Sequence, residues 1–429
     1  MMNTWKQLLL GSDQQIGRRN MIWNMIGSAI YALSSMMIGM AVTRILGADL
    51  GGIFFFAFTT FGQQMFIVSY FGMRPIQITD VQEEHSFGEY RRFRVYTSAL
   101  AILTGFFYVL FWVENPLKKM VVILMVCYKV LDGFADVYES EFQRNGKLYL
   151  TGKSNTFRTL LSVGSFLLAL VLTKDLVGSC VIAVAAQVLG FLLFNQSLIQ
   201  TLPGIVTAIR PGAVRELWQS GKWLFLSAFL DLYIFSASKY AIDAYMEPSA
   251  STYFGTIFIP TSVINLAAGF VIRPFLTTLS EYWEAGAYEK FWKVIQKIAC
   301  AIAVFTGLGM LAAYLFGIPV LALLLGSGAG SGLMPLKGAL LINILGGGFY
   351  ALLNLLYYVL VIVKDQKSIF VIYGIGCMAA VILSPWFVKN YGIHGGAYSY
   401  LLLMMGLTAL FVGAALKNYR KVRNAHGSN

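Results

Sequence analysis

Long apolar runs, separated by short polar or glycine-rich segments, follow one another along this chain. A helix needs about 20 mostly apolar residues to cross the hydrocarbon core of a bilayer. Unbroken runs of that length favour helices over the alternating strands of a membrane barrel. The pattern predicts an all-α integral membrane protein with twelve transmembrane helices, near residues 21–43, 50–73, 93–113, 119–141, 156–173, 176–196, 222–243, 251–275, 296–316, 335–363, 368–388 and 395–416.

The composition supports the same class of protein. Of the 429 residues, 58% are hydrophobic and only 12% are charged, whereas soluble domains carry about 25% charged residues. The stretch from Ile298 to Leu336 contains no charge and is longer than one span requires. We expect one helix there, followed by a glycine-rich external connection, "FGIPVLALLLGSGAGSG", with a short apolar helix at the surface.

Positive charges lie mainly on one side of the predicted spans. Most of the 32 lysines and arginines fall in segments that share a side with the N-terminus, and this count includes Lys6, Arg94, Lys153 and Arg158. Because positive loops stay in the cytoplasm, both termini are predicted to be cytoplasmic. The net charge of +12 is therefore mainly topological. Basic residues spread over several loops form no single patch, so nucleic acid is not expected as a partner.

The chain also contains a weak internal repeat. Arg74-Pro75 recurs as Arg273-Pro274, and "GEYRRF" (88–93) recurs as "GAYEKF" (286–291) at almost the same separation. We therefore expect two homologous halves of six spans each. An even number of spans gives both halves the same orientation, so they would form two parallel six-helix bundles related by a pseudo-two-fold axis along the membrane normal.

The repeat predicts four parts of the chain. Residues 1–198 would form the N-terminal six-helix bundle, and residues 199–219 a cytoplasmic linker with an amphipathic basic segment. Residues 220–416 would form the C-terminal six-helix bundle, and residues 417–429 a basic cytoplasmic tail. Two parallel bundles of this kind usually enclose a central cavity that opens alternately to each side, and substrate binds near their interface.

The fourth predicted span carries four ionisable residues, Lys129, Asp132, Asp136 and Glu139. Their spacing places them in one narrow stripe of a helix, which must face a cavity or a neighbouring helix. Ionisable residues inside a span mark functional sites. We predict Lys129 as a substrate-binding residue, and Asp132 and Asp136 as sites for a coupling ion, H⁺ or Na⁺. Alternatively, Lys129 and Asp132 neutralise each other as a structural pair, and Glu139 lies at the interface.

The seventh predicted span carries Asp231, Lys239 and Asp243. Asp231 has no partner within one turn, so we predict it as a third ion-coupling site or as the partner of a cation on another helix. Lys239 is a candidate for substrate binding, although Asp243, four residues further on, could pair with it locally.

Arg74 and Arg273 each lie near the cytoplasmic end of the second span of their half, directly before a proline. The proline removes a backbone hydrogen bond and permits a bend. A guanidinium keeps its charge and matches phosphate oxygens with a planar fork of donors. We predict that the two arginines bracket an anionic ligand. The alternative is that both extend to the lipid headgroups.

Three stretches carry a family resemblance. "NMIWNMIGSAIYALSSMMIGMAVTRILGADLGGIFFFAF" has an R-x-x-G after the first span, "FQRNGKLYLTGKSNTFRTLL" follows span four, and "YGIHGGAYSYLLLMMG" opens the last span. In these stretches and in its six-plus-six organisation, nearly the whole chain resembles the polysaccharide-transporter (Wzx-like) branch of the multidrug/oligosaccharidyl-lipid/polysaccharide (MOP) exporter superfamily.

The resemblance implies a flippase that translocates polyprenyl-pyrophosphate-linked oligosaccharide from the cytoplasmic to the outer leaflet by alternating access, for surface polysaccharide synthesis. It implies location in the bacterial cytoplasmic membrane, with membrane lipids and the polysaccharide polymerase machinery as partners. No cofactor and no enzymatic activity are expected. The three histidines lie outside the predicted spans, and no phosphate loop, metal cluster or nucleophile–base spacing is visible.

Two departures distinguish the chain from other branches of that superfamily. Multidrug extruders typically carry an acidic residue and a proline in the first span, and residues 21–43 contain neither. Lipid II flippases carry an arginine in the first span and usually two more C-terminal spans; this chain lacks both but keeps arginines in spans two and eight. The alternatives are a MATE-like cation-coupled multidrug exporter, a flippase for lipid II or teichoic-type precursors, and a non-transporting scaffold for a polysaccharide synthase.

Overall fold

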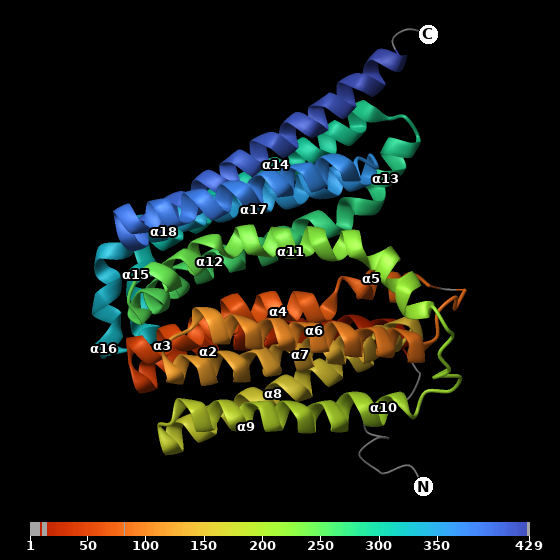
Figure 1. Ribbon diagram of the computed structural model, residues 1–429. Helices are drawn as coiled ribbons and strands as arrows, with labels where there is room; N and C mark the ends of the chain where they lie inside the picture. The colour runs from red at the N-terminus through yellow and green to blue at the C-terminus, as the bar shows by residue number, and fades with distance from the viewer. Residues whose placement is uncertain (1–8, 11–14, 81, 427–429) are drawn as a thin grey trace. The chain divides into compact units, whose positions relative to one another are not determined.

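The structure is a computed structural model that describes residues 9–10, 15–80 and 82–426 (Figure 1). Lys6 and the last three residues of the predicted tail lie outside the described residues. About 90% of the structure is helical, and the described ranges contain no β-strand. The all-α prediction is confirmed.

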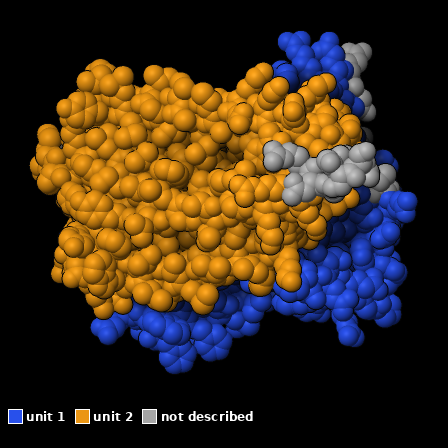
Figure 2. Space-filling view, turned by 90° about the horizontal axis from the view of Figure 1, so that it is seen from above, with its two compact units in different colours: residues 1–229 blue, residues 230–429 orange. Residues whose placement is uncertain are grey.

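The chain forms two compact units, Met1–Phe229 and Leu230–Asn429 (Figure 2). The boundary between the units falls inside α11 (Ala213–Tyr245), whose first half belongs to unit 1 and whose second half belongs to unit 2. The other helices of unit 1 are α2 (Ile16–Leu46), α3 (Ala48–Phe55), η1 (Phe56–Phe61), α4 (Gly62–Tyr70), α5 (Met73–Thr79), α6 (Phe87–Trp112), α7 (Pro116–Arg144), α8 (Leu148–Thr173), α9 (Leu176–Phe191), η2 (Leu192–Gln196) and α10 (Ser197–Ile199).

Unit 2 follows the same order with one longer connection. Its helices are α12 (Pro248–Ile272), η3 (Arg273–Phe275), α13 (Leu276–Glu284), α14 (Tyr288–Ala312), η4 (Ala313–Gly317), α15 (Ile318–Leu325), α16 (Ser327–Gly330), η5 (Ser331–Leu336), α17 (Lys337–Ile362) and α18 (Gln366–His426). Residues 113–115 suffice to join α6 to α7, whereas η4, α15, α16 and η5 join α14 to α17. The short apolar helix expected in the uncharged stretch is α15.

Within the described residues, ten helices are long and apolar enough to cross a membrane. One of them, α18, holds two predicted spans, because its backbone leaves the helical conformation at Gly392 (φ 57°, ψ −134°). A further helix, α7, is too charged to qualify by composition, but its 29 residues are long enough to span. The prediction of twelve transmembrane helices is confirmed.

Each unit is built around a central helix. In unit 1 it is α7, which packs against α4, α6, α8 and α9. In unit 2 the fourth span is α17, which packs against α12, α14 and α18. The central position of α7 explains how a span with so many charges avoids lipid.

The segment "FGMRP" bends the chain, but not at its proline. Phe71 (φ 53°) and Gly72 (φ 66°) both adopt the left-handed conformation between α4 and α5. Pro75 lies in the first turn of α5, where a missing N–H group removes no helical hydrogen bond. In the second copy, Arg273–Phe275 form one 3₁₀ turn between α12 and α13. The expectation that the proline makes the bend is therefore wrong for the first copy.

The first half of α11 packs on unit 1. The ring of Phe71 stacks on Phe225 at a centroid distance of 4.3 Å and lies 4.9 Å from the ring of Trp218. Gly221 leaves room for the Met73 side chain, which a Cβ at position 221 would strike. Because of this packing, the boundary between the units lies inside α11, later than the predicted start of the C-terminal bundle at residue 220.

The segment before α11 is fastened to the start of α6. The Gly88 N–H donates to the Val206 carbonyl at 3.1 Å, and Arg210 Nε lies 3.0 Å from Glu89 Oε1. The amphipathic basic segment expected in the linker begins as the first turns of α11, at Ala213.

Candidate functional site

The predicted stripe on α7 is buried inside unit 1. Lys129, Asp132, Asp136 and Glu139 are 2%, 5%, 7% and 5% exposed, respectively. None of them therefore faces lipid. The arginines that pair with the three carboxylates come from α5, α6 and α8, and Lys129 contacts α2 and η1. The stripe therefore faces neighbouring helices, which was one of the two orientations predicted from its spacing.

Arg158 of α8 pairs with two carboxylates of the stripe. Its Nη2 lies 3.1 Å from Asp132 Oδ1, and its Nη1 lies 2.8 Å from Glu139 Oε1. Nη1 also donates to the Asn195 side-chain oxygen at 2.9 Å, and Gln187 donates to Asp132 Oδ1 at 2.5 Å. Asp132 is thus paired with Arg158 of α8 and not with Lys129 of its own helix, α7.

Asp136 lies between two arginines. Arg74 Nη1 is 2.7 Å from Asp136 Oδ1, and Arg94 Nη2 is 3.1 Å from Asp136 Oδ2. Arg74 also donates to Gln143 Oε1 through Nε and Nη2, at 3.3 and 3.0 Å. Arg94 donates to backbone carbonyls at the end of α4. Arg74 is therefore an ion-paired residue, yet its side chain remains 25% exposed.

Lys129 has no carboxylate oxygen within 4.0 Å among the residues that the structure describes. Its Nζ donates to the Tyr31 hydroxyl at 3.3 Å and lies 4.0 Å from the centroid of the Phe58 ring. Ring faces attract a cation, but less strongly than a carboxylate at contact distance. With Arg74, Arg94 and Arg158 set against Asp132, Asp136 and Glu139, Lys129 is the surplus positive charge of this cluster.

Asp231 lies in unit 2 among tyrosines. Its Oδ2 accepts a hydrogen bond from the Tyr350 hydroxyl at 2.8 Å. No described cation lies within 4.0 Å of its carboxylate. The alternative that Asp231 pairs with a cation of another helix is therefore not found in the described part of unit 2.

Lys239 lies two turns further along α11. Its Nζ is 4.2 Å from the centroid of the Phe258 ring and 5.5 Å from that of Phe235. As far as the structure is described, no carboxylate oxygen lies within 4.0 Å of Nζ, so the local pair with Asp243 is not formed. Lys239 therefore resembles Lys129: both ammonium groups pack on aromatic rings and lack a counter-ion.

Arg273, the second Arg-Pro arginine, differs from the first. It is exposed, and none of its interactions within the described ranges is an ion pair. The two halves of the repeat thus place the same residue pair in two settings, one paired inside unit 1 and one free at the surface of unit 2. Whether both bracket a ligand stays a prediction.

Two residues that hold the cluster together were missed. Arg94 and Arg158 were counted with the cytoplasmic loops, but they are 0% and 2% exposed inside unit 1. The signal that would have found them is their position, since both fall within predicted spans (93–113 and 156–173), where an arginine needs a partner. Lys153, counted in the same way, is 7% exposed, and its Nζ donates to the carbonyl of Leu9 at 2.7 Å.

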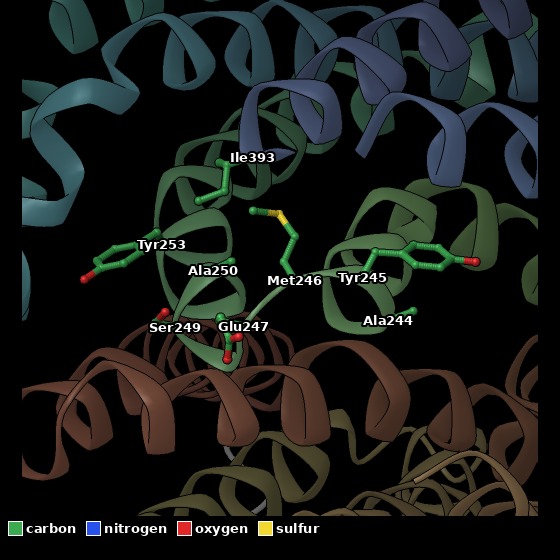
Figure 3. A pocket seen from close by; sticks show the side chains of 8 residues that line it. All are labelled: Ala244, Tyr245, Met246, Glu247, Ser249, Ala250, Tyr253 and Ile393. Atoms are coloured by element: carbon green, nitrogen blue, oxygen red, sulfur yellow. The ribbon is translucent and has the colours of Figure 1, made fainter. Parts of the chain in front are cut away.

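A cavity of about 760 Å³ opens at the turn between α11 and α12 (Figure 3). Met246 and Ile393 extend into it, whereas Tyr245 and Tyr253 point away on either side. None of the predicted site residues lines this cavity. It is therefore separate from the charges described above.

Solved structures of membrane transporters share this helical fold. The structure of "Lipid II flippase MurJ, inward closed conformation" matches with a TM-score of 0.72 and 13% identity, over 94% of this chain and 90% of that one. An inward-facing multidrug resistance MATE family transporter of the MOP superfamily matches with a TM-score of 0.68 and 11% identity, over 95% and 99%. The eukaryotic MATE transporter AtDTX14 matches with a TM-score of 0.59 and 16% identity, over 96% and 99%.

The sequence itself gives no comparable match: no protein-family model and no curated protein matches it. At identities this low, the structural matches establish the fold alone. The chain therefore has the fold that MurJ and the MATE transporters share.

Proposed function

We propose that this protein is a flippase that moves an anionic, lipid-linked glycan across the membrane by alternating access. The observation that carries the proposal is a pair of lysines without counter-ions among the described residues, the buried Lys129 in unit 1 and the half-buried Lys239 in unit 2. Burying an uncompensated ammonium is costly. A protein that keeps one in each unit gains from it only if an anion compensates the charge during part of the transport cycle.

The state of the carboxylates also favours an anionic cargo over a cationic drug. Asp132, Asp136 and Glu139 each form ion pairs with arginines. Carboxylates engaged in this way are not free to bind a cationic drug. Arg74 keeps an exposed edge, and Arg273 is exposed, so both have donors available for phosphate oxygens.

For the cargo we propose a polyprenyl-pyrophosphate-linked oligosaccharide, moved from the cytoplasmic to the outer leaflet for surface polysaccharide synthesis. The Wzx-like stretches of the sequence support this choice. MurJ, which shares the fold, is a lipid II flippase, so lipid II or a teichoic-type precursor is the alternative cargo. The proposal includes a bacterial cytoplasmic membrane, cytoplasmic termini and association with the polysaccharide polymerase machinery.

For the coupling ion, Asp231 is the strongest of the three candidates, because its carboxylate has a hydroxyl partner and no cation nearby in the described part of the chain. Asp136 would act differently. If it took up a proton, Arg74 would lose its shorter ion pair and keep only the longer one, from Nη1 to Glu139 Oε2 at 3.9 Å, so its guanidinium would be more available to the diphosphate. Asp132, held by Arg158 and Gln187, is the least available of the three.

The cargo proposal is tested in a strain that lacks the gene and is complemented with variants. Lys239→Met removes the charge at similar length, and Lys239→Arg keeps it; Lys129→Met and Lys129→Arg form the second pair. We expect the methionine variants to accumulate polyprenyl-linked intermediates, measured by mass spectrometry, and to lose surface polymer at unchanged protein levels in the membrane. Normal export by Lys129→Met together with Lys239→Met would contradict the proposal.

A MATE-like cation-coupled drug exporter is the second candidate, and Asp231 is the observation that favours it. Expression in a strain without drug exporters would then raise resistance to cationic dyes, and Asp231→Asn would abolish that resistance. We expect no gain of resistance. A dye resistance that depends on Asp231 and is insensitive to Lys239→Met would replace the flippase proposal with this one.

A further inference from the structure

A basic groove lies where the two ends of α18 meet in unit 2. The cavity has a volume of about 550 Å³ and is lined by residues of the first turns of α18 and of its last described turns. We call it the α18 groove. The residues on which the inference depends are Lys367, Val371, Leu410, Gly413, Lys417 and Lys421.

One end of the α18 groove is positively charged. Lys367, Lys417 and Lys421 line it, and none of them forms an ion pair with a residue that the structure describes. Lys417 and Lys421 are one helical turn apart, so their side chains lie on the same face. Three ammonium groups around one cavity favour an anionic ligand.

The single carboxylate of the groove does not cancel this charge. Asp365 Oδ2 accepts a hydrogen bond from Asn418 at 2.7 Å, and Oδ1 accepts one from the Ser368 N–H at 3.3 Å. Burial alone would raise the pKa of Asp365, but these hydrogen bonds, together with the positive charge of Lys417, hold the pKa below its usual value. Asp365 therefore stabilises the turn before α18 through its hydrogen bonds. With three lysines and one carboxylate, the groove keeps a net positive charge.

The other end of the groove is apolar and open. Val371 and Leu410 are 48% and 42% exposed, and they lie one turn after Lys367 and two turns before Lys417. Gly413, which also lines the groove, contributes no side chain, and a Cβ built there would meet no atom within 4 Å. The groove thus has three lysines at one end and an apolar surface at the other. This distribution matches a phospholipid, which has a charged head group and apolar chains.

We propose that the α18 groove binds an anionic phospholipid, with its phosphate at the three lysines and an acyl chain along Val371 and Leu410. Anionic lipids concentrate in the cytoplasmic leaflet, and this is the end of unit 2 that the charge distribution places in the cytoplasm. The bound lipid joins the α17–α18 turn to the C-terminal end of α18. The site is separate from the transported cargo and does not depend on it.

The charge of the groove is tested by native mass spectrometry of the purified full-length protein, titrated with phosphatidylglycerol or phosphatidylcholine. The groove variant carries Lys367→Gln, Lys417→Gln and Lys421→Gln. The matched control carries Lys290→Gln, Lys293→Gln and Lys297→Gln, three exposed lysines of α14 that do not line the groove. We expect phosphatidylglycerol to bind the wild type and the control alike, and the groove variant about ten-fold or more weakly. Equal binding by the two triple variants, or equal binding of both lipids to the wild type, would overturn the proposal.

The apolar half is tested without changing any charge. Gly413→Leu fills the slot, whereas Gly406→Leu adds the same side chain on the same helix, also into open space but outside the groove. We expect Gly413→Leu alone to weaken phosphatidylglycerol binding. Glycerol phosphate, which has the head but no chain, should not compete. If Gly413→Leu binds normally, or if glycerol phosphate displaces the lipid, the groove is a phosphate site and the lipid proposal fails.

Discussion

The central helices of the two units hold the same place in the helix order but are fixed by different interactions. Inside unit 1, α7 carries Lys129, Asp132, Asp136 and Glu139, and its neighbours supply the arginines that compensate the carboxylates. Inside unit 2, α17 carries no charge after Lys337. In the described structure it is held by close packing of neighbouring side chains against its glycines instead of by ion pairs.

The contact depends on three consecutive glycines of α17. A Cβ at Gly346 would lie 2.7 Å from Tyr400 of α18, and one at Gly347 would lie 2.8 Å from Thr261 of α12. At Gly348 the nearest atom, in Thr306 of α14, would be 2.5 Å away. Each glycine thus allows one neighbouring helix to approach, as small residues do between membrane helices.

This difference bears on function. The charges of unit 1 are mostly used to specify its own packing, since buried ion pairs fix an arrangement more surely than they add stability. The half-buried charges of unit 2, Asp231 and Lys239, lie on α11 and not on the central helix, and neither has a partner of opposite charge among the described residues. Under the proposed function, unit 2 would use these charges for the ligand, and unit 1 would contribute Lys129 and the exposed edge of Arg74.

We expect the largest loss of stability when the ion pairs around α7 are broken. Arg158→Ala would leave Asp132 and Glu139 buried without their arginine, and removing one partner of a buried pair costs about 3–5 kcal/mol. We expect a large fall in the melting temperature of the purified protein, or failure to accumulate in the membrane. The matched control is Arg273→Ala, because Arg273 is exposed and has no ion pair in the described part of the chain. Equal melting temperatures for the two variants would show that the network does not stabilise unit 1.

The second largest loss of stability is expected when the close packing at the glycines of α17 is disrupted. Gly348→Leu would force the new side chain against Thr306, and overpacking of this kind typically costs about 1–3 kcal/mol. Gly338→Leu is the control, because Gly338 lies on the same helix and a Cβ there would meet no atom within 4 Å. We expect a lower melting temperature for Gly348→Leu alone. A fall for both variants would point to the loss of glycine itself and not to close packing.

The spans were predictable because their signal is local. An apolar run of sufficient length is sufficient evidence for a helix, even in α7, where the run is interrupted by charges at helical spacing. The same spacing showed that those charges share one face and cannot meet lipid. Local sequence thus determined where the helices are and which face of α7 is buried.

The partners of the charges were not predictable, because they depend on which helices meet. Asp136 is paired only because α5 and α6 both pack beside α7. The two copies of Arg-Pro illustrate the limit most clearly. Arg74 finds a carboxylate on the central helix of its unit, whereas α17, the counterpart of α7, offers none to Arg273. A repeat in sequence therefore does not imply a repeated interaction.

The third effect has the opposite sign. Lys129→Met removes a buried ammonium and Lys239→Met a half-buried one, and neither has a counter-ion among the described residues. The contact with aromatic rings offsets only about 2 kcal/mol of a desolvation cost of several kcal/mol. We expect a gain in stability of roughly 0.5–2 kcal/mol together with the loss of export. The melting temperature of Lys290→Met, an exposed control, should not change. If Lys129→Met and Lys239→Met are less stable than the wild type, the lysines are structural and the comparison between the units loses its functional meaning.

The smallest effect concerns the segment before α11. Arg210 pairs with the buried Glu89, but its own side chain is 57% exposed, so water and salt screen the interaction. We expect Arg210→Gln to leave the melting temperature unchanged, because α6 and α11 are held by their packing. The change should appear locally: with Arg210 gone, the hydrogen bond from the Gly88 N–H to Val206 opens more often, and amide hydrogen exchange at residues 86–90 becomes faster. Arg215→Gln removes the same charge from a neighbouring exposed position and should leave that exchange rate at its wild-type value. If both variants exchange at the wild-type rate, backbone contacts alone hold the linker on α6, and the Arg210–Glu89 pair does not stabilise it.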